Sequence, residues 1–330
     1  MESINVLVSG VLGEECLQQI SSISPRIKLT DVSDLFRAEQ RGDSVFKEKL
    51  DALLAEAEVM FGFRLPQNVI ARAPKLKWVQ VMSAGVNRFL DADMVESPVM
   101  ITSVSGIHAT PISEFVLGLM LMFVKQAPLC FQLKQEKQWR RFTSSVLRSK
   151  TVGVVGFGSI GREVARLAKT FGMRVLATRR SAKRVGRARY VDIMLPREQL
   201  RQLFAESDFV VLTLPLTAET TKLIGEEELR TMKSTAYLIN IARGGVVDEE
   251  ALIRALDEGW IAGAGLDVFV TEPLPPESRL WEFPNVILSP HVSGSMEGYA
   301  VRATELFSEN LRRYLNGKKL LNVVDKKMGY

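Results

Sequence analysis

The chain has few of the residues that build metal sites, disulfide frameworks or membrane spans. Its 330 residues include only two cysteines, Cys16 and Cys130, which show no spacing typical of metal or redox motifs. A reduced, cytoplasmic protein that binds no metal is therefore expected. The longest apolar run, Phe115–Val124, contains a glycine and is far too short to span a bilayer. We expect it to form a core or interface helix, with no membrane as partner.

Other absences narrow the class of protein further. The first residues, Met1–Val8, lack a basic segment and a cleavage-like site, and we expect a strand there and no signal peptide. Aromatic residues make up 8% of the chain, and a net charge of +5 is spread along it, so a nucleic-acid partner is not indicated. What remains is an ordinary globular composition, with a length typical of roughly two domains.

Short apolar strands alternate with helical stretches in two series, which predicts two parallel α/β domains. In the first series the predicted strands are Asn5–Ser9, Ala57–Gly62, Lys77–Met82 and Val99–Thr102, with helices such as Glu14–Ile20 and Phe46–Ala55 between them. In the second they are Thr151–Val155, Arg174–Thr178, Phe209–Leu214, Ala236–Ile241, Ala262–Asp267 and Val286–Leu288. Ligands of such folds bind at the carboxyl ends of the strands, so an active-site cleft between the domains is expected.

Three further helices are predicted outside this alternation. One runs from Pro111 to about Ala127, where Pro128 is expected to stop it. A polar helix, Cys130–Arg141, follows. The last, Tyr299–Leu315, is strongly amphipathic and ends at an Asn-Gly pair, a typical stop signal.

A glycine-rich turn at 156–161 stands between the predicted strand 151–155 and an amphipathic helix. Strand, Gly-x-Gly-x-x-Gly turn and helix in this order indicate the start of a dinucleotide-binding unit. The glycines allow a tight turn and close packing, and the helix N-terminus favours a phosphate. The predicted cofactor contacts are Gly156, Gly158, Ser159, Ile160 and Gly161.

The end of the second strand of this unit indicates which dinucleotide is bound. In NAD-binding units an acidic residue about twenty positions beyond the glycines binds the ribose 2′-hydroxyl. Counting 18 residues from Gly161 reaches Arg179, and the segment Thr178-Arg179-Arg180-Ser181 contains no acid. Arginine and hydroxyl side chains suit a 2′-phosphate. We therefore predict a preference for NADP(H), with NAD(H) as the alternative cofactor and solvated arginines as the alternative interpretation.

Only two histidines are available as proton donors near neutral pH. His291 follows a predicted strand end, where catalytic side chains of α/β proteins gather. His108 precedes the first long helix, and we interpret it as a surface or helix-start residue.

Charged residues at two other strand ends complete a candidate catalytic group. Arg243 follows an apolar strand at a glycine-rich turn, and its planar fork matches a substrate carboxylate. Asp267 and Glu272 lie at and beyond the next strand end. A glutamate hydrogen-bonded to a histidine favours the protonated ring. Taken alone, each of these residues would be interpreted as a surface charge. Only their joint placement at strand ends indicates catalysis.

The ordered motifs resemble those of the D-isomer-specific 2-hydroxyacid dehydrogenases over nearly the whole chain, and of their NADP-using, glyoxylate/hydroxypyruvate reductase-like members in particular. The segments that carry the resemblance are 156–161, Leu214-Pro215-Leu216-Thr217 with Thr220, Asn240–Gly245, Gly265–Phe269 with Glu272-Pro273, and Ser289-Pro290-His291. The resemblance implies that Arg243 binds the substrate, that Glu272 tunes His291, and that His291 is the acid/base. It further implies cofactor contacts from Leu214, Pro215, Thr220, Ile241, Ala242, Arg243, Asp267 and His291.

The same resemblance assigns roles to the rest of the chain. It implies that Ala84 and Gly85 bind the substrate carboxylate, together with Arg243 and His291. It implies a substrate domain of residues 1–101 plus 297–330, a dinucleotide-binding domain of residues 102–296, and a homodimer built by helices around 111–141. Arg179-Arg180 departs from the commoner NAD-using members.

The predicted reaction is reversible hydride transfer between NADP(H) and C2 of a 2-oxo acid. The resemblance to the NADP-using members implies glyoxylate or hydroxypyruvate as the substrate, and larger aliphatic or aromatic 2-oxo acids are the alternatives. The alternative is a cofactor-sensing interaction protein that resembles the C-terminal-binding corepressors, because those proteins retain a dehydrogenase-like site. Turnover on a simple 2-oxo acid separates the two.

Overall fold

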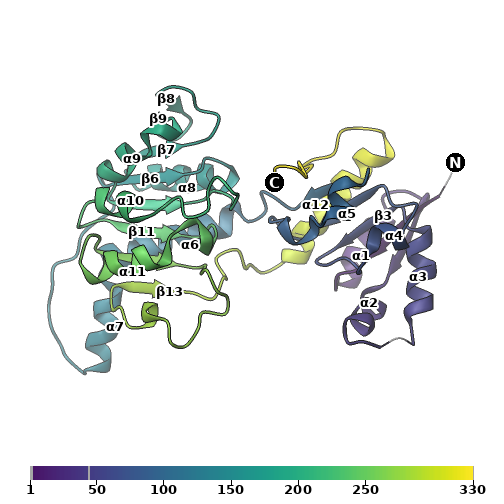
Figure 1. Cartoon of the computed structure of the whole chain (residues 1–330), viewed down its shortest axis with the longest axis horizontal. Coiled ribbons are helices and arrows are strands. Elements are labelled where there is room, and N and C mark those ends of the chain that lie inside the picture. The colour runs from purple at the N-terminus through teal and green to yellow at the C-terminus, as the bar shows by residue number, and fades with distance from the viewer. Residues whose placement is uncertain (1–2, 44, 330) are drawn as a thin grey trace. The chain divides into compact units, whose positions relative to one another are not determined.

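The computed structural model describes residues 3–43 and 45–329 and divides into two compact units. Unit 1 comprises Met1–Ile107 and Met296–Tyr330, and unit 2 comprises His108–Ser295. Each unit has its own sheet of mainly parallel strands with helices packed on both faces, which confirms the predicted fold class (Figure 1). The substrate-binding and cofactor-binding roles predicted for the two domains stay predictions.

Unit 1 is built on a five-stranded parallel sheet with strand order β2-β1-β3-β4-β5. Its strands are β1 (Ile4–Val8), β2 (Ile27–Asp31), β3 (Val59–Gly62), β4 (Trp78–Val81) and β5 (Met100–Ser103). β3 and β4 are buried along their whole length, as expected of parallel strands covered on both faces. The edge strand β2 carries polar residues and was not predicted from the sequence.

Helices cover both faces of this sheet. They are α1 (Glu14–Ser21), α2 (Ser33–Gln40), α3 (Lys47–Glu56), α4 (Val69–Arg72), the 3₁₀ turn η1 (Asn87–Phe89), α5 (Ala92–Glu96) and α12 (Tyr299–Leu315). α12 has the predicted bounds and packs beside α1, where Phe307 stacks on Phe61 with ring centroids 4.2 Å apart. The C-terminal helix therefore completes the core of unit 1.

Unit 2 is built on an eight-stranded sheet with strand order β13-β12-β11-β10-β6-β7-β9-β8. Its strands are β6 (Thr151–Val155), β7 (Arg174–Thr178), β8 (Gly186–Ala188), β9 (Val191–Leu195), β10 (Phe209–Leu212), β11 (Tyr237–Asn240), β12 (Gly263–Leu266) and β13 (Val286–Leu288). All neighbours pair in parallel except β8 with β9. The order reverses between β6 and β10, and such a switch point is where doubly wound sheets bind ligands.

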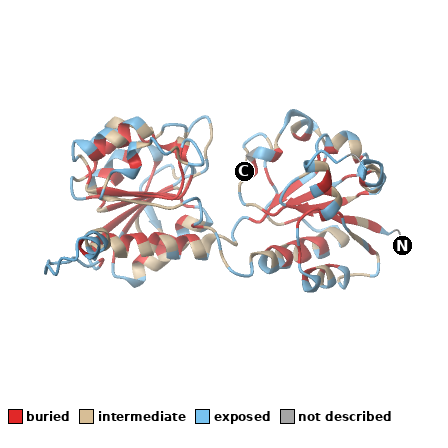
Figure 2. Cartoon of the chain, turned by 90° about the horizontal axis from the view of Figure 1, so that it is seen from below, coloured by how far each residue is buried: buried red, intermediate tan, exposed pale blue. Residues whose placement is uncertain are grey.

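The helices of unit 2 pack on the sheet through two apolar clusters, one on each face. They are α6 (Ala109–Val124), α7 (Ala127–Gln135), α8 (Ser159–Thr170), α9 (Leu200–Glu206), α10 (Glu226–Thr231), α11 (Glu249–Asp257) and the 3₁₀ turns η2 (Arg197–Gln199), η3 (Gly244–Val246) and η4 (Arg279–Trp281). Alternate residues of β6 face opposite clusters: Val154 packs with α6 and α8, and Val155 with α9 and α11. Figure 2 shows the sheets as buried and the outer helix faces as exposed.

The helices that precede β6 differ from the prediction. α6 ends at Val124, and α7 starts at Ala127 with Pro128 in its first turn. Pro128 therefore begins a helix where the sequence analysis expected it to stop one, because the first turn needs no backbone N–H from this residue. The predicted helix Cys130–Arg141 is also wrong in its end, since α7 stops at Gln135 and a long loop leads back to β6 (Figure 1).

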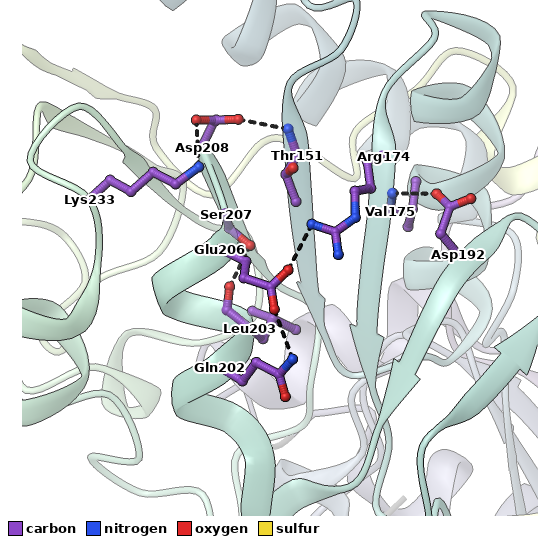
Figure 3. Close-up of polar contacts among 10 residues, drawn as sticks. All are labelled: Thr151, Arg174, Val175, Asp192, Gln202, Leu203, Glu206, Ser207, Asp208 and Lys233. Carbon is purple, nitrogen blue, oxygen red and sulfur yellow. Dashed lines mark hydrogen bonds and ion pairs between the residues drawn. The ribbon is translucent and has the colours of Figure 1, made fainter.

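Carboxylates hold the amino ends of the central strands of this sheet together (Figure 3). Asp208, just before β10, accepts a bond from the N–H of Thr151 at 2.7 Å and from Lys233 Nζ at 3.0 Å. Asp192 of β9 accepts one from the N–H of Val175 at 2.8 Å. These bonds join β10 to β6 and β9 to β7 at their amino ends.

Among the described residues, no single helix is long and apolar enough to cross a membrane. α6 and α7 taken together reach the length and composition of a span but are bent by 63° relative to each other.

Candidate active site

The glycine loop lies at the switch point between β6 and β10. Its three glycines differ in how much space a side chain would have. Gly156 has φ +97°, and a Cβ there would lie 3.0 Å from Leu214. A Cβ on Gly161 would lie 2.3 Å from the carbonyl oxygen of Gly156, so only glycine allows this close helix–strand packing. At Gly158 nothing stands within 4 Å of such a Cβ. The turn therefore packs tightly on the protein at Gly156 and Gly161 and leaves open space at Gly158.

The helix that follows is suited to an anion. α8 begins at Ser159, next to the open position, and the residue before it, Gly158, gives it no side-chain cap. The first N–H groups of a helix have no intrahelical partner and carry the positive end of the helix dipole. Ser159 and Ile160 are in this first turn. The loop therefore fits the pyrophosphate of a dinucleotide.

The end of β7 presents the basic segment predicted to select NADP(H). Thr178 is buried at the last position of the strand, whereas Arg179, Arg180 and Ser181 are exposed. The N–H of Ala182 donates to the carbonyl oxygen of Arg179 at 3.0 Å, which closes a turn. Two guanidinium groups and a hydroxyl thus follow the second strand of the dinucleotide unit, with no carboxylate in this segment.

The loop after β10 is braced by its own hydroxyl groups. The Oγ1 atom of Thr220 donates to the carbonyl oxygen of Pro215 at 2.7 Å and accepts from the N–H of Thr217 at 2.7 Å. Leu214, at the start of this loop, packs on Gly156. The predicted cofactor contacts Leu214, Pro215 and Thr220 therefore lie on one ordered loop beside the glycine turn.

Arg243 follows β11 on a loop that the strand's last residue organises. The side chain of Asn240 donates to the carbonyl oxygen of Arg243 at 3.0 Å and accepts from the N–H of Ala242 at 3.1 Å. Ile241 and Ala242 are buried, and Arg243 is exposed. A Cβ on Gly244 would lie 1.9 Å from the backbone of Phe269, so this loop packs directly on the one after β12.

His291 and Glu272 form a hydrogen-bonded pair. Nδ1 of His291 lies 2.8 Å from Oε2 of Glu272, and about half of the histidine side chain is exposed (49%). The other oxygen of Glu272 accepts a bond from the N–H of Phe269 at 3.1 Å, which orients the carboxylate. Because Nδ1 faces the carboxylate, Nε2 is the nitrogen left to exchange a proton with a substrate.

Asp267 directly follows β12 and contacts the segment that carries His291. Its side chain is completely buried and accepts hydrogen bonds from Ser289 and from the backbone of residues 292 and 293. The contact to the nicotinamide that the resemblance implies stays a prediction. The structure adds a set of protein contacts that sequence reasoning missed, because they depend on the adjacency of β12 and β13.

His108 lies closer to this group than the sequence indicated. It precedes α6 as predicted, but it is partly buried, and its ring packs on Gly294, 3.0 Å from where a Cβ would stand. Burial, and secondarily the positive charge of Arg243, lowers the pKa of His108. His108 is therefore a neutral neighbour of the loop that carries His291. No sequence motif marked it, since the contact joins the start of α6 to the loop after β13.

Ala84 and Gly85 belong to unit 1, on the loop after β4. Ala84 is exposed, and the hydroxyl of Ser83 donates to the carbonyl oxygen of Gly85 at 2.8 Å. Tyr299 of α12 donates to the carbonyl oxygen of Met82 at 2.7 Å, and burial raises the pKa of Tyr299 to about 12. The phenol therefore stays a donor and holds the start of this loop at the carboxyl edge of the sheet in unit 1.

Comparisons with known proteins show which family the chain resembles. The model of the D-isomer specific 2-hydroxyacid dehydrogenase NAD binding domain matches residues 117–293. The glyoxylate reductase of Thermococcus gammatolerans is 37% identical over 84% of this chain and 84% of its own length. Among solved structures, a D-isomer specific 2-hydroxyacid dehydrogenase from Xanthobacter autotrophicus in complex with NADPH and MES is 31% identical, has a TM-score of 0.84 and covers 100% of both chains.

A second similar structure is an NADPH-dependent glyoxylate/hydroxypyruvate reductase from Sinorhizobium meliloti in complex with NADP and sulfate. It is 28% identical, has a TM-score of 0.82 and covers 99% of this chain and 100% of its own. Fold, glycine loop and comparisons together define an oxidoreductase with a dinucleotide-binding unit. The chain belongs to the D-isomer specific 2-hydroxyacid dehydrogenase family, which confirms the resemblance inferred from its motifs.

Proposed function

We propose that this chain catalyses reversible hydride transfer between NADP(H) and C2 of a 2-oxo acid, with a D-2-hydroxy acid as the reduced product. The observation that carries the proposal is the 2.8 Å contact between Nδ1 of His291 and Oε2 of Glu272 at the carboxyl edge of the sheet in unit 2. The exposed guanidinium of Arg243 lies on the neighbouring loop. The names of the relatives support the same reaction.

Each residue of this group has a task in the proposed reaction. The bound nicotinamide supplies or accepts the hydride. Arg243 binds the substrate carboxylate and stabilises the charge that develops on the carbonyl oxygen. Nε2 of His291 donates the proton that turns this oxygen into a hydroxyl, and takes it back in the oxidation. Glu272 holds the ring and favours its protonated form.

Ala84 and Gly85 are proposed to bind the substrate carboxylate through backbone N–H groups. Ala84 is exposed, and the small side chains of this loop let a ligand approach the backbone. Like the roles of Arg243, Glu272 and His291, this assignment is carried over from the family motif. Changing Ala84 to Val should raise KM for the 2-oxo acid and leave KM for the cofactor unchanged.

NADP(H) is proposed as the preferred cofactor and NAD(H) as the weaker one. The support is the exposed pair Arg179 and Arg180 after β7, with Thr178 and Ser181 beside it and no acid in the segment. Two similar solved structures contain NADPH or NADP. The glycine loop would hold the pyrophosphate, and Ile241, Ala242 and the loop after β10 would line the rest of the cofactor.

The deciding experiment is a steady-state assay with NADPH and with NADH on glyoxylate, hydroxypyruvate, pyruvate and phenylpyruvate. We expect turnover on at least one acid and a higher kcat/KM with NADPH. An equal or higher value with NADH would overturn the cofactor preference. Tight NADPH binding without turnover on any acid would contradict the enzyme and favour the cofactor-sensing interaction protein.

A homodimer is proposed to form through α6, α7 and the loop that follows. The support is the exposure of large apolar side chains there: Phe131 is 58%, Trp139 96% and Val146 56% exposed in the single chain. Light scattering on the purified protein should give twice the mass of the chain, and Trp139→Ser with Phe131→Ser should shift it toward the monomer. A monomeric wild type would overturn this proposal.

A further inference from the structure

The backbone of His291 has a conformation that a histidine rarely adopts. Its φ is +54°, in the left-handed region that favours glycine. A glycine would remove this cost but also the imidazole. Such a conformation persists only where surrounding bonds hold it, and it often marks a functional site.

Those bonds come from one buried carboxylate. Asp267 is 0% exposed, and its Oδ1 accepts from the hydroxyl of Ser289 at 2.6 Å and from the N–H of Val292 at 2.8 Å. Its Oδ2 accepts from the N–H of Ser293 at 3.0 Å. The three donors lie on both sides of His291 in the chain. The carboxylate therefore fixes the position of the segment that carries the histidine.

The backbone of Asp267 also bonds the two neighbouring loops. The N–H of His291 donates to the carbonyl oxygen of Asp267 at 2.9 Å, and the N–H of Asp267 donates to the carbonyl oxygen of Asn240 at 3.0 Å. Asn240 is the residue whose side chain orders the Arg243 loop. Asp267 thus links the loops that carry the arginine and the histidine.

Because the carboxylate of Asp267 is buried, its hydrogen-bond donors must stay in place. A carboxylate removed from water needs hydrogen-bond donors, and any shift of the 289–293 segment would leave it without them. Glu272 bonds the imidazole ring, whereas the carboxylate of Asp267 bonds residues on either side of His291 and its carbonyl oxygen bonds the N–H of His291. The ring of His291 is placed correctly only when both its backbone and its Nδ1 are fixed.

We propose that Asp267 is a positioning residue that holds the backbone of His291 in its left-handed conformation and so aims the imidazole at the substrate. This rests on the proposed role of His291 as acid/base. It adds to the cofactor contact implied for Asp267 a role within the protein that acts through His291.

The first test is kinetic and uses Asp267→Asn in the wild type and in a His291→Asn background. In the wild type kcat should fall by about 10- to 100-fold, because the acid/base is no longer aimed at the substrate. In the His291→Asn background it should cause no further loss, because there is no acid left to aim. An equal loss in both backgrounds would overturn the proposal.

The second test does not depend on turnover. Hydrogen exchange should show the amides of Val292 and Ser293 protected in the wild type and exposed in Asp267→Asn. The matched control is Asp208→Asn, which removes a similar carboxylate–amide bond at the opposite edge of the sheet (Figure 3) and should leave these amides protected. Unchanged protection in Asp267→Asn would contradict the proposal. If the wild type turns over no 2-oxo acid, the proposed function fails while this test still decides the positioning.

A milder pair of variants covers the case in which Asp267→Asn does not fold. Ser289→Ala removes one donor to Asp267, and Ser289→Thr keeps the hydroxyl. Ser289→Ala should lower kcat and the protection of Val292, and Ser289→Thr should restore both. Equal values in the two variants would contradict the proposal.

Discussion

Charged residues have different roles at the two edges of the sheet in unit 2. At the amino edge, charged groups are paired: Asp208 with Lys233 at 3.0 Å, and Arg174 with Glu206 at 2.7 Å (Figure 3). At the carboxyl edge Arg243 is exposed, and it forms no ion pair with any residue in 3–43 or 45–329. Paired charges hold the strands together. Nη1 of Arg243 donates to the carbonyl oxygen of Ala242 at 2.6 Å, a neutral acceptor that leaves the positive charge available to an anionic ligand.

Two carboxylates, the partly buried Asp208 and the completely buried Asp267, show the same difference between the edges. Asp208 bonds the first N–H of a strand, and its loss should loosen only the sheet. Asp267 bonds the segment around His291, and its loss should misplace a functional group. The comparison therefore predicts that changes at the amino edge alter stability, and that changes at the carboxyl edge alter turnover.

The largest expected effect is at His291. Changing His291 to Asn should lower kcat by about 10²- to 10⁴-fold, the range for loss of a general acid/base. The NADPH dissociation constant and the melting temperature should stay close to wild type, because about half of this side chain is exposed. Steady-state kinetics, fluorescence titration and thermal melting measure the three quantities. A wild-type kcat would refute the assigned role.

The alternation of apolar strands with helices, together with the motifs, allowed most of the fold to be anticipated. The strands Thr151–Val155, Arg174–Thr178 and Val286–Leu288 and the helix Tyr299–Leu315 have their predicted bounds, because apolar runs and stop signals mark them. Two strands of unit 2, β8 and β9, were missed; β8 is a short, mostly exposed antiparallel strand without apolar periodicity.

The candidate site could be predicted only in part. Motifs located Arg243, Glu272 and His291, because each follows a predicted strand. The packing of His108 on Gly294 and the grip of Asp267 on residues 289–293 could not be predicted. Both depend on which strands and helices become neighbours in space, which spacing along the chain does not reveal.

A smaller effect is expected where the carboxyl edge meets the cofactor. Changing Arg179 and Arg180 together to Gln should lower kcat/KM for NADPH by about tenfold or more and leave the NADH value nearly unchanged, because charge-assisted bonds to the 2′-phosphate are lost. Arg184→Gln, a nearby exposed arginine, is the matched control. An equal fall with both cofactors would contradict the assignment.

At the amino edge the expected effect is on stability alone. Changing Asp208 to Asn should lower the free energy of unfolding by roughly 1–3 kcal/mol, because the N–H of Thr151 loses a charged acceptor. Urea unfolding measures this, and kcat should stay within about twofold of wild type. A large loss of kcat in a folded Asp208 variant would break the distinction between the edges.

The smallest effect concerns pH and His108. Because burial and Arg243 lower the pKa of His108, the unfolded chain binds a proton below about pH 6.5 that the folded chain does not. Stability should therefore fall as the pH drops below that value, with a slope of at most about 1.4 kcal/mol per pH unit. His108→Asn should flatten the dependence of the melting temperature between pH 7 and 5. An unchanged curve would contradict this.

The most direct test of the central claim is a double-mutant cycle on Glu272 and His291, read out as kcat for 2-oxo acid reduction with NADPH. If the pair works as one acid/base unit, Glu272→Gln should lower kcat in the wild type by about tenfold or more and have no further effect in the His291→Asn background. If Glu272→Gln lowers kcat by the same factor in both backgrounds, or in neither, the two residues do not act together and the account of the site is wrong.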